Sequence, residues 1–244
     1  IYNEDGSKVI TFNGEIYNYQ TLHEELIAAG HTFTTKSDTE VLLHGYEQWG
    51  VDLLQRVRGM FTFVIWDKNK QELFGARDHF GIKPFYYAKM NGTFMYASEI
   101  KSLLRHPDFV KELNAEALKP YMTFQYPAIG ETFFKGVYKL PEGHYFTYRD
   151  GKMDIHRYYD EDFREGKQKL GELVNSIDQT VCDSVKAHQI ADVEVGSFLS
   201  SGVDSSYVAA VARPQHTYSI GFGKGTYNES QQAGELAELL KLNN

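Results

Sequence analysis

The chain has 244 residues, of which 42% are hydrophobic, and its 33 acidic and 25 basic residues give a net charge of −8. This composition is typical of a globular protein and excludes a disordered or fibrous chain. No basic stripe is present that could follow a nucleic acid or an anionic membrane, so we expect neither as a partner. One cysteine excludes a disulfide framework and a multi-cysteine zinc site, and it favours a cytoplasmic location.

No apolar run approaches the roughly 18 residues that span a bilayer, and the first residues lack the basic and apolar regions of a secretion signal. The chain starts at Ile1 without an initiator methionine and ends within an amphipathic helical pattern over residues 234–244. We therefore expect the sequence to be truncated at both ends.

The first half of the chain interleaves short strand patterns, rich in Phe, Tyr, Val and Ile, with two helix patterns. Tight-turn residues at 67–70 and 90–92 predict antiparallel hairpins. Glycines at 30 and 50 stop the two helices. The expected strands cover residues 8–12, 60–66, 72–76, 84–89 and 93–97, and the helices cover 17–29 and 39–49.

After residue 150 the pattern changes. A long helix is predicted over 169–188, and it is followed by a strand (194–199), a loop of small residues, a helix (205–212), a strand (216–222) and the final helix. This βαβα order is typical of a parallel sheet. The apolar face of the long helix comprises Leu170, Leu173, Val174, Ile177, Val181 and Val185. We expect an antiparallel α+β domain over 1–158, a linker over 159–168 and the beginning of an α/β domain over 169–244.

The small-residue loop of the second region contains Ser200, Ser201, Gly202, Asp204 and Ser205. It lies between a strand and a helix, where free N–H groups and the helix dipole favour an anion. In an isolated string, Ser and Asp would more simply cap the helix. The βα context favours ligand binding, because α/β proteins bind ligands at the carboxyl ends of their strands.

This loop resembles the PP-loop, S-G-G-x-D-S, of the ATP pyrophosphatases, which adenylate a carboxylate or carbonyl oxygen. Ser201 stands where that pattern has its first glycine, which requires backbone angles that suit an L-residue. The resemblance implies that the loop holds the pyrophosphate of ATP, that Phe198 and Ile220 flank the adenine, and that Asp204 binds Mg²⁺ directly or through water.

A second constellation begins with Asn13, Gly14 and Glu15, which follow the first predicted strand, and continues with Ser37 to Glu40 after what we interpret as another strand. Each has a simpler explanation. Asn-Gly is the commonest tight-turn pair, and Ser37 with Glu40 fits a capping box.

Together with the motifs over 77–84, 97–101 and 140–144, however, these segments resemble the amidotransferase half of the glutamine-hydrolysing asparagine synthetases. The resemblance covers residues 9–242, so it also includes the PP-loop. It implies an N-terminal-nucleophile sandwich of two antiparallel sheets between helices, αββα, followed by the start of a parallel-sheet domain.

For the site, the resemblance implies that Asn13 and Gly14 form an oxyanion hole and that Glu15 and Asp38 bind the substrate glutamine, with Asp38 meeting its ammonium group. The family's nucleophile is an N-terminal cysteine, whereas this sequence begins with Ile1. The one cysteine, Cys182, lies on the long helix, where we interpret it as a packed, inert thiol. We therefore expect these 244 residues alone to lack glutaminase activity.

The function implied for the whole protein is ATP-dependent conversion of aspartate to asparagine through β-aspartyl-AMP, with ammonia from glutamine and with ATP and Mg²⁺ required. Two alternatives stay open: a β-lactam-type amide-forming synthetase with an inert glutaminase-like domain, and a non-catalytic fragment that binds partners. The oligomeric state is open as well, with a homodimer as one option.

Two other groups of residues receive simpler interpretations. Arg77 and Asp78 are predicted to form a structural ion pair that fixes a turn between strands. The nine histidines show no H-x-x-x-H pairing with nearby acids, so we expect no metal site built by protein side chains alone.

Overall fold

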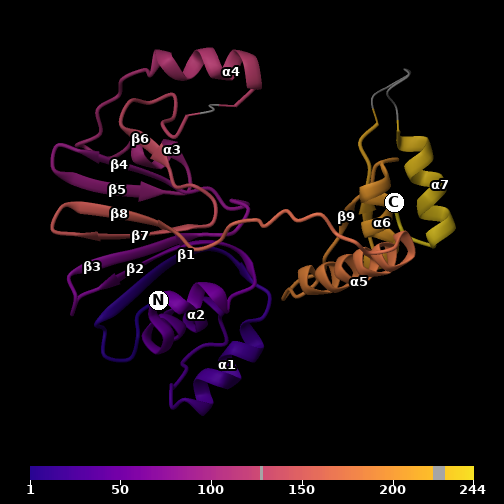
Figure 1. Cartoon of the computed structure of the whole chain (residues 1–244), viewed down its shortest axis with the longest axis horizontal. Coiled ribbons are helices and arrows are strands. Elements are labelled where there is room, and N and C mark those ends of the chain that lie inside the picture. Colours follow the sequence, from indigo (N-terminus) through magenta and orange to yellow (C-terminus); the bar gives the residue numbers. More distant parts are fainter. Residues whose placement is uncertain (127–128, 222–228) are drawn as a thin grey trace. The chain divides into compact units, whose positions relative to one another are not determined.

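The computed structural model describes residues 1–126, 129–221 and 229–244 (Figure 1). The chain divides into two compact units, Ile1–Asp162 and Phe163–Asn244. This division falls inside the segment 159–168 that we interpret as a linker, and residues 158–169 form neither helix nor strand. Within the described residues, no helix combines the length and apolar character needed to cross a membrane.

The first unit contains two antiparallel sheets. The larger sheet has the strand order β1 (Lys8–Ile16), β2 (Gly59–Asp67), β3 (Glu72–Arg77), β7 (His144–Arg149) and β8 (Lys152–Arg157). The smaller sheet has the order β5 (Thr93–Ala97), β4 (Tyr86–Met90) and β6 (Val137–Lys139). The helical elements are α1 (Tyr19–Ala28), α2 (Asp38–Trp49), η1 (Gly50–Gln55), α3 (Ile100–Leu103), η2 (Ala115–Ala117) and α4 (Leu118–Phe124).

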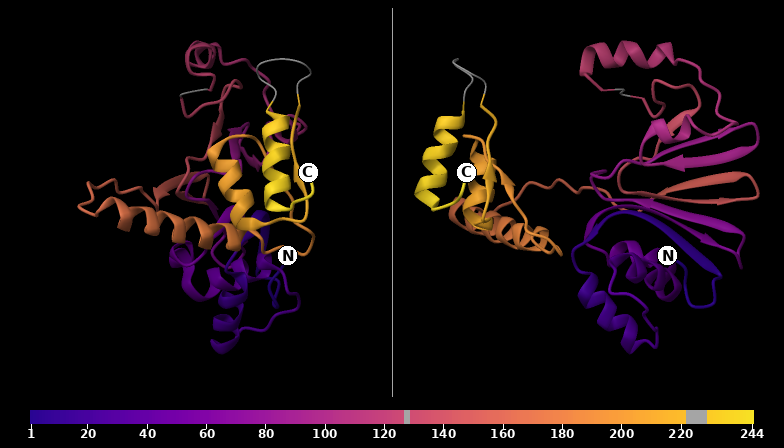
Figure 2. Two further views of the ribbon diagram at one scale, coloured as in Figure 1. Left: turned by 90° about the vertical axis from the view of Figure 1, so that its right-hand side faces the viewer. Right: turned by 180° about the vertical axis from the view of Figure 1, so that it is seen from behind.

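The two sheets stack face to face, with α1 and α2 against the outer face of the larger one (Figures 1 and 2). Strand alternation produces these layers, because successive side chains point to opposite faces. In β5, Phe94 and Tyr96 pack between the sheets with Val64, whereas Met95 points outward and packs with Leu103 of α3. The predicted αββα sandwich is therefore confirmed.

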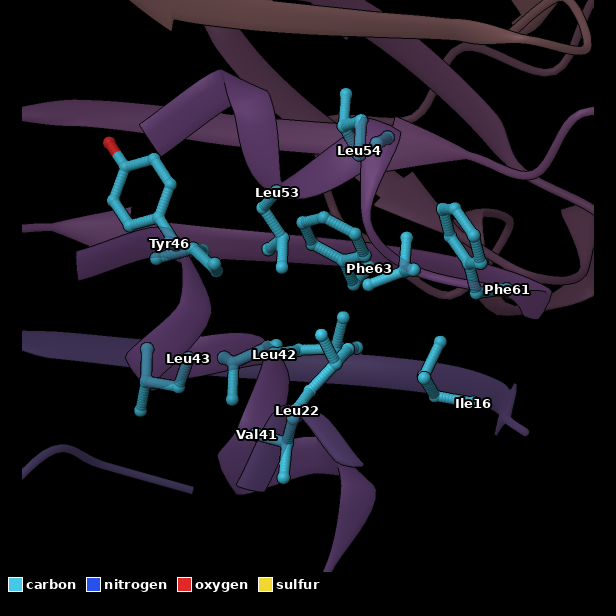
Figure 3. Close-up of a cluster of buried hydrophobic side chains, with 14 of the residues drawn as sticks. Ile16, Leu22, Val41, Leu42, Leu43, Tyr46, Leu53, Leu54, Phe61 and Phe63 are labelled. Carbon is cyan, nitrogen blue, oxygen red and sulfur yellow. The ribbon is translucent and has the colours of Figure 1, made fainter. Parts of the chain in front are cut away.

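The main core lies between α1, α2 and the larger sheet (Figure 3). Leu42 of α2 and Phe63 of β2 belong to it, and both are almost completely buried. Burying a large apolar side chain contributes about 1.5–3 kcal/mol, so this cluster fixes α2 on the sheet. The position of α2 matters for the site because its first residue is Asp38.

Tight turns join the strands as predicted between β2 and β3 and between β4 and β5. In the second hairpin Asn91 and Gly92 have φ values of 49° and 82°, which is the left-handed geometry that two-residue hairpins need. The β7–β8 hairpin was not predicted, although Asp150 and Gly151 carry the same signal, with φ values of 52° and 77°.

The second unit contains α5 (Leu170–His188), β9 (Ser197–Phe198), α6 (Val203–Ala212), β10 (Thr217–Tyr218) and α7 (Ser230–Leu240). β9 and β10 are parallel, so the predicted βαβα order is confirmed. The strands are shorter than predicted, and Phe222 at the end of the second lies outside the described residues. On α5 only the end of the apolar face is packed: Val185 is 8% exposed, whereas Leu170 is 77% exposed.

Two predictions about strands are wrong. The first strand does not end at Phe12, because β1 continues through Asn13 and Gly14 to Ile16, so the alternative of an Asn-Gly turn is excluded as well. No strand precedes Ser37, since residues 30–37 form neither helix nor strand.

Candidate functional site

Strand β1 presents alternate side chains to two layers. Ile10 and Ile16 lie in the core under the helices, whereas Asn13 faces the smaller sheet. There the Asn13 Nδ2 donates a 3.0 Å hydrogen bond to Oγ of Ser98, the residue directly after β5. By alternation Glu15 projects to the same side of β1 as Asn13.

A cavity of about 310 Å³ opens beside this hydrogen bond, between the two sheets of the first unit. Its wall combines the polar groups of Asn13 and Ser98 with aromatic and small side chains. The lining residues are Thr11, Phe12, Asn13, Thr62, Phe63, Val64, Phe85, Tyr96, Ala97 and Ser98.

Gly14 occupies a position with no room for a side chain. A Cβ there would lie 2.2 Å from the carbonyl oxygen of Met60 and 2.7 Å from Cα of Phe61, both in β2. Because both neighbours are backbone atoms, they could not move aside without separating the strands. The glycine is therefore required by the close approach of β1 and β2 and not by a turn.

The N–H of Gly14 points to the outer edge of β1. Phe61, the residue opposite Gly14 in β2, directs both its N–H and its C=O to Asp78 on the other side of β2. The N–H of Phe61 donates to Oδ2 of Asp78 at 3.1 Å, and the carbonyl oxygen of Phe61 accepts from the N–H of Asp78 at 2.8 Å. Gly14 and Phe61 therefore form a non-hydrogen-bonded pair. Ile16, two residues on, has the same orientation, and its N–H donates to Asp38 Oδ2 at 3.1 Å.

Asp38 thus lies at the edge of β1 where the N–H of Gly14 emerges. The N–H groups of Gly14 and Ile16 are separated along the strand by about 7 Å, the length of two extended residues. The structure therefore brings together three of the predicted site residues, Asn13, Gly14 and Asp38, at the end of one strand, with Glu15 between them in sequence.

The capping box predicted at α2 is only half formed. Ser37 Oγ accepts a 3.2 Å hydrogen bond from the N–H of Thr39, as an N-cap should. The carboxylate of Glu40, however, accepts its hydrogen bonds from the N–H and hydroxyl groups of Thr34 and Thr35. Burial alone would raise the pKa of Glu40, but these hydrogen bonds lower it to about 2. Glu40 therefore fixes the segment that leads into Asp38.

Arg77 and Asp78 fix a turn, but not as the predicted ion pair. Arg77 donates to three carbonyl oxygens, those of Gly81, Lys83 and Leu140. Asp78 accepts from four backbone N–H groups, those of Phe61, Phe80, Ile82 and Lys83. Both side chains replace the backbone partners that the turn itself cannot supply.

In the second unit, serine hydroxyl groups connect the two ends of the loop between β9 and α6. Oγ of Ser200 lies 2.7 Å from Oγ of Ser205, and the N–H of Gly202 donates to Ser200 Oγ at 3.2 Å. The φ of Ser201 is not positive, so a serine fits where the PP-loop pattern has glycine. The N-cap of α6 is Gly202, without a side-chain cap, so the simple capping interpretation of this loop is wrong.

A cavity of about 300 Å³ adjoins this loop. Phe198 and Ile220, the two predicted adenine neighbours, both line it and are 79% and 68% exposed. Sequence reasoning missed Tyr218, Ser219, Glu229 and Ser230 of the same wall. Asp204 lies in the first turn of α6 and is exposed.

Two further features lie away from the predicted residues. Cys182 on α5 is half-buried, with Asp178 Oδ1 4.0 Å from its sulfur. An apolar cavity of about 370 Å³ is lined by α5 and α6, and none of the predicted site residues contributes to it.

The histidines also include a cluster that sequence reasoning missed. One ligand atom each of His31, His44 and Glu47 lies within 4.8 Å of the others. Burial alone would lower the pKa of His44, but the 2.9 Å hydrogen bond with Glu47 and the charges of nearby carboxylates raise it. The helical spacing of His44 and Glu47, three residues apart, was the available signal.

Comparison with known proteins matches the two parts of the chain to two families. Residues 1–159 match the family described as glutamine amidotransferase domain, and residues 176–244 match asparagine synthase. The chain is 43% identical over 99% of its length to asparagine synthetase [glutamine-hydrolyzing] 1 of Bacillus subtilis, and 36% identical over 87% to asparagine synthetase [glutamine-hydrolyzing] 3 of the same organism. A putative asparagine synthetase [glutamine-hydrolyzing] of Mycobacterium bovis is 39% identical over 95%.

The chain spans 39%, 36% and 38% of the lengths of these three relatives. Both family matches follow the order that the two structural units have in the chain, amidotransferase first. The chain therefore belongs to the glutamine amidotransferase family, and its amidotransferase domain is followed by a segment that matches asparagine synthase.

Proposed function

We propose that these residues are part of an asparagine synthetase that takes its nitrogen from glutamine. The first unit would release ammonia from glutamine, and the second would use ATP to activate aspartate as β-aspartyl-AMP, which ammonia then attacks. The observation that carries the proposal is that the Asn13 amide, the outward N–H of Gly14 and the Asp38 carboxylate all lie at one end of β1.

In the glutaminase half, the developing oxyanion would accept hydrogen bonds from the Asn13 amide and the Gly14 N–H. Such donors act strongly because they are fixed before charge develops. Asp38 would bind the ammonium group of glutamine, and Glu15 would contribute to the same substrate site. The proposal takes the nucleophile from outside these 244 residues, because their one cysteine, Cys182, lies on α5 of the second unit.

In the synthetase half, Ser200, Ser201, Gly202 and Ser205 would hold the pyrophosphate of ATP, with the adenine against Phe198 and Ile220. The exposed carboxylate of Asp204, in the first turn of α6, offers the oxygen ligands that Mg²⁺ prefers. When bound, Mg²⁺ would neutralise part of the phosphate charge.

The test uses glutamine labelled with ¹⁵N at its amide. The whole protein, given this glutamine with aspartate, ATP and Mg²⁺, should produce asparagine labelled at the amide, with one AMP and one pyrophosphate for each product. A β-lactam-type synthetase would release pyrophosphate with its own substrate but would transfer no label from glutamine. Absence of labelled asparagine from a folded, ATP-binding protein would reject the proposal.

A further inference from the structure

The hydroxyl of Ser98 lies against the amide of Asn13, and no other part of the proposed mechanism uses it. The two residues are 85 positions apart and meet because β1 of the larger sheet faces β5 of the smaller one. Their hydrogen bond, 3.0 Å from Nδ2 to Oγ, forms part of the wall of the 310 Å³ cavity.

The backbone of Asn13 is already fixed by the sheet. Because Gly14 and Phe61 form a non-hydrogen-bonded pair, the neighbouring pair of Asn13 and Thr62 is the hydrogen-bonded one. What the sheet does not fix is rotation of the Asn13 side chain about its own bonds. An amide used as an oxyanion donor must hold one orientation before the reaction begins.

We propose that Ser98 is a positioning residue for the glutaminase reaction: its hydroxyl accepts one N–H of the Asn13 amide and so directs the other N–H toward the oxyanion. This inference rests on the proposed function of Asn13. An asparagine side-chain amide has two N–H donors, so one can be held by Ser98 while the second remains for the substrate.

The effect of removing the hydroxyl follows from its chemistry. Ser98→Ala deletes one neutral hydrogen bond, which typically contributes about 0.5–1.5 kcal/mol, equivalent to a loss of roughly twofold to tenfold in rate. Since the oxyanion exists only in the reaction, kcat for glutamine should fall by this factor while KM stays within about twofold. Ammonia-dependent asparagine formation should keep its rate. Ser98→Thr, which retains a hydroxyl, should recover most of kcat.

A matched control lies two residues away on the same strands. The hydroxyl of Tyr96 is 3.1 Å from Oγ1 of Thr11, so it also connects β5 with β1 and lines the same cavity. Tyr96→Phe removes this connection without touching Asn13. If Ser98 acts through the amide and not by holding the two sheets together, kcat should fall more in Ser98→Ala than in Tyr96→Phe.

The decisive experiment is a double-mutant cycle in the whole protein, with glutamine hydrolysis as the readout. In an Asn13→Ala background, Ser98→Ala should cause no further loss, because Ser98 acts only through that amide. An equal loss in both backgrounds, a Ser98→Thr as slow as Ser98→Ala, or a Ser98→Ala with wild-type kcat would overturn the inference. Failure of the wild type to hydrolyse glutamine would instead reject the proposed function.

Discussion

The backbone N–H of Ile16 donates a hydrogen bond to Oδ2 of Asp38, with 3.1 Å between the two atoms. This contact joins the end of β1 to the first turn of α2 across 22 residues of sequence. It uses one carboxylate oxygen and holds the carboxylate at the outer edge of the strand. The proposed oxyanion donors and the proposed ammonium-binding group therefore share one rigid support.

Asp38→Asn tests the charge of this group separately from its hydrogen bond. The asparagine side-chain oxygen can still accept from Ile16, but it cannot pair with a substrate ammonium ion. Hydrogen bonds to charged groups contribute about 1.5–3 kcal/mol, so KM for glutamine should rise by roughly tenfold to a hundredfold. Asp52→Asn, an exposed change in η1, is the control and should leave KM unchanged. An unchanged KM in Asp38→Asn would remove Asp38 from the glutamine site.

Gly14→Ala should destabilise the first unit, because the new methyl group would meet backbone atoms of Met60 and Phe61. Overpacking of this kind typically costs about 1–3 kcal/mol. Fluorescence-monitored thermal unfolding reports on this unit alone, since both tryptophans, Trp49 and Trp66, lie in it. Gly130→Ala should leave the melting temperature unaltered, because nothing lies within 4 Å of a Cβ there. Equal melting temperatures for the two variants would contradict the account of Gly14.

Glu40 should make the first unit sensitive to acid. Its pKa in the folded protein is about 2, below its ordinary value of 4.5, so the charged form stabilises the fold. That contribution is complete above about pH 4.5 and is lost as the pH falls through the folded-state pKa. The shift corresponds to roughly 3 kcal/mol.

Urea unfolding between pH 7 and pH 3, followed by tryptophan fluorescence, checks this dependence. Glu40→Gln should be less stable than the wild type at pH 7, and the difference should shrink as the pH falls below 4.5. The exposed Glu24→Gln on α1 serves as the control for a changed charge. If the wild type and Glu40→Gln lose stability in parallel down to pH 3, the Thr34 and Thr35 hydrogen bonds do not have the assigned role.

Asp204→Ala should abolish asparagine formation from either nitrogen source while glutamine hydrolysis continues. A carboxylate beside a bound triphosphate needs a cation between them, which is the role assigned to Mg²⁺. Because Asp204 is exposed and the N-cap of α6 is Gly202, little stability should be lost. Pyrophosphate release should be followed at several Mg²⁺ concentrations. Release at the wild-type rate from the variant would exclude Asp204 from the nucleotide site.

Local sequence patterns were sufficient to predict many of the helices and strands. Strand β5 has the predicted bounds, and α5 starts one residue later than predicted. The β7–β8 hairpin could also have been found from Asp150-Gly151. Asn13-Gly14 could not be assigned correctly from local sequence, because the close approach of Met60 and Phe61 keeps this pair within a strand.

The contacts that assemble the site depend on tertiary structure. Asp38 reaches Ile16 only because the core fixes α2 on the sheet, and Ser98 reaches Asn13 only because two sheets stack. Neither distance is visible in the spacing of residues. The resemblance to asparagine synthetases assigned roles to Asn13 and Asp38 but none to Ser98, which it included only within the motif 97–101; the role proposed for Ser98 rests on its hydrogen bond to Asn13.

The proposed role of the Asn13 amide is to stabilise charge during glutamine hydrolysis and not merely to support β1. The most direct test compares asparagine formation by Asn13→Ala in the whole protein with glutamine and with ammonium as nitrogen source. With glutamine the rate should fall by about a hundredfold to a thousandfold, the usual effect of losing one oxyanion donor, whereas the rate with ammonium should stay unchanged. An equal fall with both sources in a folded protein would contradict the proposed role.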